Sequence, residues 1–188
     1  MQSEAGDEEG SLATLQAGRE KYPSDQALLT QELNYYLKNG KMDEALANLN
    51  AAIENEPTNY MFYFARGTIY DNKKELENAV TNYLKSGELK PDHFDSFYNL
   101  GALYYNQGAD LLTKANMIPP SESARYEKQK TEAVEVLKKG LPHLEKAHEL
   151  NPKDASTMNS LKTVYILVGE TEKAIEMTKK IEAAAAGQ

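Results

Sequence analysis

The three histidines are the residues in this 188-residue chain best suited to acid–base or metal chemistry. His143 and His148 belong to one predicted helix, but a separation of five residues places them off a common helical face. His93 lies far from both, at a junction between predicted helices. Because none of the three has a second ligand at a metal-binding spacing, we expect no metal site, no catalytic histidine and no cofactor.

The sequence also has few of the features that bind phosphate or nucleic acid. No glycine-rich phosphate loop follows a strand, because no segment shows the pattern of a strand. The net charge of -8 argues against nucleic acid as a partner. Arginine, which recognises phosphate and carboxylate in a bidentate manner, occurs three times against 18 lysines. We therefore expect that the protein is not an enzyme.

The compartment is not readable from these residues. The chain has no cysteine, so its redox environment leaves no trace. No apolar run approaches the roughly 20 residues that span a bilayer, so we expect no direct membrane insertion. Residues 1–10 are acidic and polar, unlike a signal peptide. The protein is predicted to be periplasmic or exported if a signal peptide was removed, and otherwise cytoplasmic.

The elements that position these residues follow a proline period. Pro23, Pro57 and Pro91 are 34 residues apart, and two amphipathic helical patterns lie between successive prolines. In the stretch 60–91, Gly67 and Ala79 lack bulk, so the two helix backbones can approach closely where they cross. Neither helix can bury its apolar stripe alone, so each must pack on its neighbours. The period therefore predicts a helical solenoid.

This pattern resembles the tetratricopeptide repeat (TPR), a helix-turn-helix unit of 34 residues. The resemblance implies an all-α fold, a right-handed superhelix of helix pairs in one domain over residues 11–184. The predicted parts are a disordered acidic tail (1–10), a capping or half-repeat helix (11–22), repeats at 24–57, 58–91, 92–152 and 153–184, and a tail (185–188). The helix over 11–22 looks like the second helix of an incomplete repeat. We therefore expect a fragment of a longer protein, or alternatively a lone capping helix.

The third repeat is elongated, as in some extracytoplasmic bacterial TPR proteins. Pro152 follows Pro91 by 61 residues, which is 27 more than the period. Helical signals continue on both sides of Pro119 and Pro120, and a loop of that length without structure is uncommon. Residues 106–139 are therefore predicted to form an antiparallel helical arm that turns near 117–121. Met117 and Ile118 at its tip are candidate contacts for a second interaction.

Candidate partner-binding residues come from the TPR resemblance, which implies a concave groove lined by the first helix of each repeat. Positions carried over from the family are Asn34, Phe64, Thr68, Tyr98, Asn99, Tyr105 and Asn159. The two-carboxylate clamp of chaperone-associated TPR domains is absent, because other residues replace its lysines, arginine and one asparagine, namely Thr30, Ala65, Asp95 and Asn99. The groove is instead rich in amides and aromatic rings, which suit an extended peptide.

The leading functional hypothesis is a non-catalytic scaffold that binds a peptide or protein segment in this groove. One alternative is a structural subunit that assembles through the arm or the ends of the solenoid, so that oligomers are possible. Another is an accessory domain of a larger exported protein. The identity of the partner is not encoded in any motif of the chain.

Overall fold

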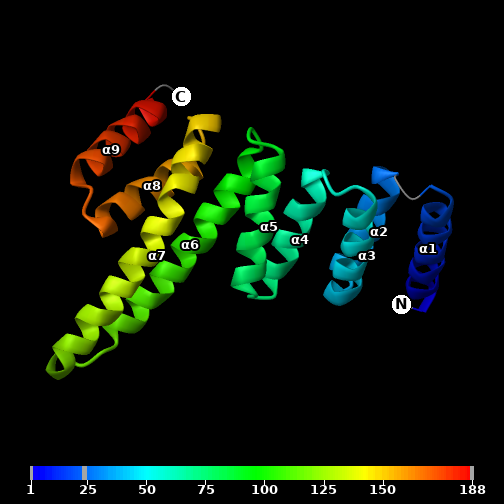
Figure 1. The fold of residues 1–188 in the computed structure, drawn as a ribbon, viewed down its shortest axis with the longest axis horizontal. Coiled ribbons are helices and arrows are strands. Elements are labelled where there is room, and N and C mark those ends of the chain that lie inside the picture. The colour runs from blue at the N-terminus through cyan, green and yellow to red at the C-terminus, as the bar shows by residue number, and fades with distance from the viewer. Residues whose placement is uncertain (1, 23–24, 187–188) are drawn as a thin grey trace.

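A computed structural model of the chain describes residues 2–22 and 25–186 as a row of α-helices packed in pairs (Figure 1). Figure 1 shows the two ends of the chain at opposite ends of the row. The predicted all-α solenoid with one extended hairpin is confirmed, and the described residues contain no strand. The helices are α1 (Gln2–Lys21), α2 (Gln26–Lys38), α3 (Met42–Asn55), α4 (Tyr60–Asn72), α5 (Leu76–Leu89), α6 (Phe94–Asn116), α7 (Ser123–Leu150), α8 (Ala155–Val168) and α9 (Thr171–Ala186).

The first helix of each pair begins at the same point of the period. Asp25, Asn59 and Asp154 precede α2, α4 and α8, and each side chain accepts a hydrogen bond from a backbone N–H of the first turn. Such caps satisfy donors that the helix leaves unpaired. His93 occupies the equivalent place before α6, where its side chain makes no capping hydrogen bond. The repeat is therefore regular in its caps except at this histidine.

The turn inside each regular pair needs one residue with a left-handed backbone. Gly40 and Gly169 take φ values of 69° and 85°, and Lys74 takes the same place with φ 63°. In each turn the next residue donates its N–H to the carbonyl of a tyrosine five residues earlier. This is the Schellman arrangement, which favours glycine because a Cβ is strained there. Lys74 therefore stores local strain that its two counterparts avoid.

Replacing Lys74 by glycine is expected to stabilise the protein by about 1 kcal/mol, the cost of a left-handed residue that carries a Cβ. Denaturant unfolding followed by circular dichroism measures the change. Glycine at the exposed Thr81 in α5 is the matched control and should destabilise by roughly 0.3 kcal/mol, because that backbone is helical and glycine is a poorer helix former than threonine. Equal shifts in both variants would contradict this account of the turn.

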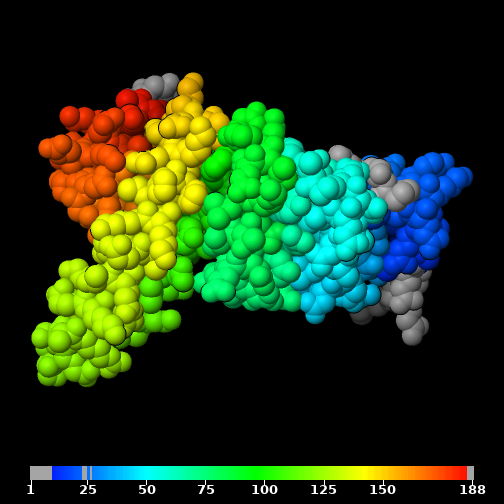
Figure 2. Space-filling model, in the orientation of Figure 1, coloured from blue at the N-terminus to red at the C-terminus, as the bar shows by residue number. Residues whose placement is uncertain are grey.

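The arm is a tightly packed pair of helices. Helices α6 and α7 contain 23 and 28 residues against 13 or 14 in most others, so the hairpin extends about 15 Å further at 1.5 Å per residue. Figures 1 and 2 show it projecting from the row. A Cβ at Gly101 or Gly108 would lie 2.6 Å from Leu144 or Leu137. Glycines thus bring the two helices into close contact along the hairpin.

Two predicted tails differ from the structure. The disordered tail predicted over residues 1–10 is wrong from Gln2 onwards, because α1 begins there. Extending a helix that already exists avoids the cost of nucleating a new one, which favours continuation into this segment. The predicted tail over 185–188 is partly helical, since α9 reaches Ala186 through a run of alanines, the best helix formers. Residues 187 and 188 lie outside the described residues, as do Met1, Pro23 and Ser24.

Candidate binding groove

An apolar pocket lies between α2 and α4, the first helices of the first two repeats. Its volume is about 180 Å³, less than the roughly 300–1,000 Å³ of typical small-molecule sites, and it suits a single apolar side chain. Leu49 and Phe62 are buried in its wall, whereas Met61 is 51% exposed. No charged residue belongs to the lining, which consists of Leu29, Thr30, Leu33, Leu49, Met61, Phe62, Phe64 and Ala65.

Phe64 connects this pocket to an aromatic cluster at the start of the third repeat. Its ring centroid lies 5.0 Å from that of His93, in an edge-on arrangement. The Tyr60 ring contacts the same histidine at 4.8 Å, also edge-on. Burial lowers the pKa of His93, while Asp95 and Asp92 oppose that shift. The groove therefore passes from an apolar pocket to a neutral imidazole beside carboxylates.

Three predicted groove residues converge on the buried Tyr83. The Tyr83 hydroxyl donates to Oγ1 of Thr68 at 3.4 Å, and the Thr68 hydroxyl donates to the carbonyl of Phe64 at 3.1 Å. A side-chain hydrogen bond from Asn99 also reaches Tyr83, and burial raises the pKa of this phenol. Because these polar groups pair with one another, the half-buried side chains of Phe64, Thr68 and Asn99 are held in place along one wall of the groove.

The remaining predicted groove residues are spread along the first helices. Asn34 is exposed on α2. Tyr98 stacks on Phe94 with centroids 5.7 Å apart, and both Tyr98 and Tyr105 pack against the core formed by α7, α8 and α9. The amide of Asn159 is exposed and donates to the carbonyl of Ala155. The structure therefore does not bring these four to one point with Phe64.

Sequence reasoning missed the inward half of the pocket and the role of Arg66. Leu29, Leu49 and Phe62 fall on packing positions, and the opening beside them depends on how far α2 stands from α4. Arg66, the one departure from the family pattern in its helix, donates to Oδ1 of Asn82 and of Asn50, both at 2.7 Å. Asparagine recurs at 48 and 82, one period apart, and these two side chains accept from Arg19 and Arg66 respectively, so the recurrence was the available signal.

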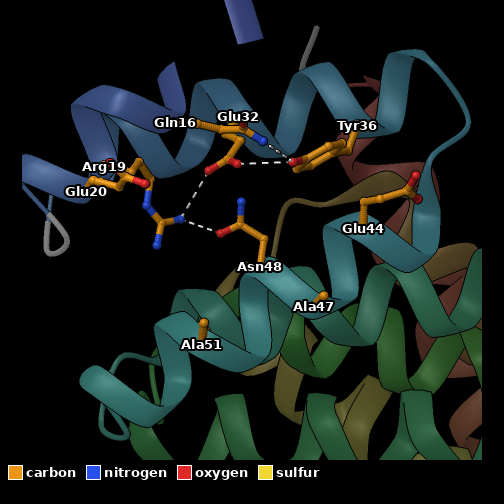
Figure 3. A pocket seen from close by; sticks show the side chains of 9 residues that line it. All are labelled: Gln16, Arg19, Glu20, Glu32, Tyr36, Glu44, Ala47, Asn48 and Ala51. Carbon is orange, nitrogen blue, oxygen red and sulfur yellow. Dashed lines mark hydrogen bonds and ion pairs between the residues drawn. The ribbon is translucent and has the colours of Figure 1, made fainter. Parts of the chain in front are cut away.

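A larger and more polar cavity of about 550 Å³ lies between α1 and α3 (Figure 3). Arg19 from α1 pairs with Glu32 at 3.5 Å and also donates to Oδ1 of Asn48. Gln16 donates to the Tyr36 hydroxyl at 3.1 Å, which donates to Glu32 at 3.2 Å. Burial and the Glu32 carboxylate raise the pKa of Tyr36. These contacts tie α1 to the first repeat. Among the described residues, none pairs with the buried Nε of Arg19.

The tip of the arm exposes one of its two predicted contacts. Met117 is 77% exposed, the largest value among the large apolar residues of the described chain. Ile118 is only half-buried, and its N–H donates to the carbonyl of Ala115 at 2.9 Å. An exposed methionine at the end of a projecting hairpin offers a small apolar contact.

The described residues offer no constellation for catalysis at a metal. Within residues 2–22 and 25–186, no three His, Asp or Glu side chains gather closely enough to hold a metal ion. Across the same ranges, no helix combines the length and apolar character that crossing a membrane requires. What the groove offers to a partner is the apolar surface of the α2–α4 pocket and the hydrogen-bonding side chains beside it.

Comparisons with known proteins agree with the repeat pattern. Two family models match, one described as "TPR repeat" over residues 69–108 and one described as "Tetratricopeptide repeat" over residues 28–59. A search of curated proteins by sequence finds no match.

Solved structures share the fold at low sequence identity. A crystal structure of MamA matches with a TM-score of 0.71 and 17% identity over 98% of this chain and 92% of that one. A second MamA crystal structure gives 0.65 and 18% over 97% and 85%. A human IFIT1 dimer with m7Gppp-AAAA gives 0.57 and 18% over 91% of this chain but 36% of that one. At such identities these structures show a shared fold alone.

Proposed function

Because the chain is a tetratricopeptide-repeat protein, we propose that it is a non-catalytic scaffold whose groove binds an extended segment of a partner protein. The observation that carries the proposal is the apolar pocket between α2 and α4, with Met61 half exposed and no charge in its lining. An apolar anchor in a pocket is the usual centre of binding energy in protein interfaces. TPR domains generally bind protein or peptide partners, which supports this use of the groove.

The proposal is tested by capturing partner proteins and measuring whether a charged residue introduced into the pocket weakens their binding. Met61→Glu puts a carboxylate at the exposed rim and should lower the affinity of groove partners by at least about tenfold, or about 1.4 kcal/mol. Leu84→Glu on α5 is the matched control, because Leu84 is 41% exposed and outside the pocket. Proteins captured by the parent are identified by mass spectrometry, and their affinities for both variants are then measured.

The groove assignment requires partners that distinguish the two variants. Loss with Met61→Glu and retention with Leu84→Glu is the expected pattern. If every captured protein binds both variants as tightly as the parent, the groove is not the binding site. Thermal unfolding of both variants checks that the fold is intact, which we expect because both side chains are exposed.

The exposure of Met117 favours a second candidate function, assembly through the arm. The hairpin carries acidic and basic residues in similar numbers, whereas the whole chain has a net charge of -8. The arm is therefore the surface least repelled by another copy of the chain. A Met117→Ser variant that lowers the oligomer mass seen in sedimentation would support assembly by this route.

A further inference from the structure

His93 precedes α6 at the capping position of the repeat, but its side chain does not cap the helix and makes a different hydrogen bond. The equivalent residues Asp25, Asn59 and Asp154 each accept a hydrogen bond from their own helix. The Nδ1 of His93 instead lies 2.7 Å from the hydroxyl of Ser96. Because aspartate or asparagine would cap α6 better, the helix itself gives no reason for histidine at this place.

A chain of hydrogen bonds determines which nitrogen of His93 carries the proton. The Ser86 hydroxyl lies 3.0 Å from the carbonyl of Tyr60 and must donate, because a carbonyl only accepts. Ser86 therefore accepts from Ser96, whose hydroxyl is 2.7 Å away. Ser96 has then used its single proton and accepts from Nδ1–H of His93. The neutral imidazole is thereby held with a lone pair on Nε2.

This lone pair stands beside a second acceptor. Nε2 of His93 lies 3.8 Å from Oδ2 of Asp95, and the two side chains are 20% and 60% exposed. Ser86 and Ser96 are fully buried, so the Nδ1 edge of the ring faces the interior. Asp95 occupies a groove position carried over from the family, and the His93 ring contacts Phe64 of the pocket. Two neighbouring acceptors at this place call for a donor from a bound partner, and a cationic donor best suits a carboxylate and an imidazole lone pair.

The surrounding charges favour a cation at this point. Asp92 lies close to His93 in the chain, but Lys90 pairs with it at 2.9 Å. Asp95 has only the neutral histidine as its close partner among the described ion pairs. The chain carries a net charge of -8, so its overall field also attracts a basic segment. Phe64 contacts His93 on one side and forms part of the apolar pocket on the other.

We propose that the groove selects a segment in which an apolar side chain fills the α2–α4 pocket and a nearby lysine or arginine donates to Nε2 of His93 and the carboxylate of Asp95. This inference rests on the proposed function, because it assigns the chemistry of the segment that the groove binds. Phe64 separates the two subsites, so the apolar and basic residues of the segment lie close together in its sequence. Charge complementarity thus takes the place of a carboxylate clamp.

Selection of a random-peptide display library on the intact protein tests this specificity. Enriched peptides are expected to share an apolar residue and a lysine or arginine at a fixed short separation. Asp95→Asn should weaken a selected peptide by about tenfold, the loss of about one charge-assisted hydrogen bond. Asp110→Asn, the same change at an exposed acid further along α6, should leave the affinity unchanged.

A second variant and a pH profile test the role of His93. His93→Asn keeps a preferred capping residue and removes Nε2, so the protein should fold and bind the peptide less tightly. Protonation of Nε2 also removes the lone pair, so binding to the parent should weaken as the pH falls through the pKa of His93. Asp92, Asp95 and Lys90 are the charged groups around this ring, and the titratable side chain of Tyr60 packs against it from α4. The His93→Asn variant should lack this acid loss of affinity.

The outcomes separate this inference from the proposed function. If peptides lost by Met61→Glu carry no basic residue, or are insensitive to Asp95→Asn and His93→Asn, the basic subsite is wrong and the groove assignment stands. If no peptide is enriched, or none is sensitive to Met61→Glu, both fail. Enrichment of basic peptides that lose affinity in Asp95→Asn and His93→Asn, but not in Asp110→Asn, supports the subsite.

Discussion

Replacing Gly140 by leucine is expected to lower the free energy of unfolding by about 3 kcal/mol, at the upper end of the range for overpacked cores. A Cβ at this residue would lie 2.8 Å from Cβ of Tyr104 and 3.1 Å from the backbone oxygen of Gly101. Neither atom sits at the end of a flexible side chain, so α6 and α7 must move apart to admit the new atoms. Urea unfolding monitored by circular dichroism measures the loss.

Gly10→Leu is the matched control for this change. Gly10 lies within α1, and a Cβ there would have no atom within 4 Å. Leucine at this residue gains helix propensity without a clash, so the free energy of unfolding should stay unchanged or rise by up to about 1 kcal/mol. Similar losses in both variants would mean that the hairpin tolerates separation of its helices and is not closely packed at Gly140.

The helix pairs are predictable from the chain because the signals that define them are local. The proline period, the capping residues Asp25, Asn59 and Asp154, and Gly40 at a left-handed turn all act within a few residues of their place in the sequence. The left-handed backbone of Lys74 is not predictable in this way, since lysine has no preference for a positive φ. Its turn is imposed by the packing of α4 on α5.

The binding groove is less predictable because it depends on contacts between repeats. Family positions place Tyr98 and Phe64 alike on first helices, yet one packs towards the last repeat and the other forms a pocket wall. The assignment of the His93 proton needs Ser86, Ser96 and the Tyr60 carbonyl together. These groups come from three different helices or their ends, and the direction of their hydrogen bonds appears only in three dimensions.

Removing residues 107–133 and replacing Glu135 by glycine is expected to leave a folded, regular solenoid. The deletion joins Asn106 to Val134, so that Glu135 takes the place that Lys74 holds in the preceding repeat, where φ is 63°. Glycine at 135 supplies that left-handed residue. The free energy of unfolding should fall by no more than about 3 kcal/mol, because the removed Gly108 and Ala133 face each other within the hairpin. The expected loss comes from Leu112, a removed residue that packs against the core of α7, α8 and α9.

Partner binding then shows whether the arm acts as a second interaction surface. Because Met117 is lost with the deletion, any partner that holds the arm tip should bind the shortened protein at least about tenfold more weakly. Groove partners sensitive to Met61→Glu should keep their affinity. The same deletion with Glu135 retained is the matched control and should be about 1 kcal/mol less stable, since glutamate is strained at a positive φ. Global unfolding of both proteins would show that the arm belongs to the core. A folded protein with undiminished affinity for every partner would instead show that the arm has no binding role.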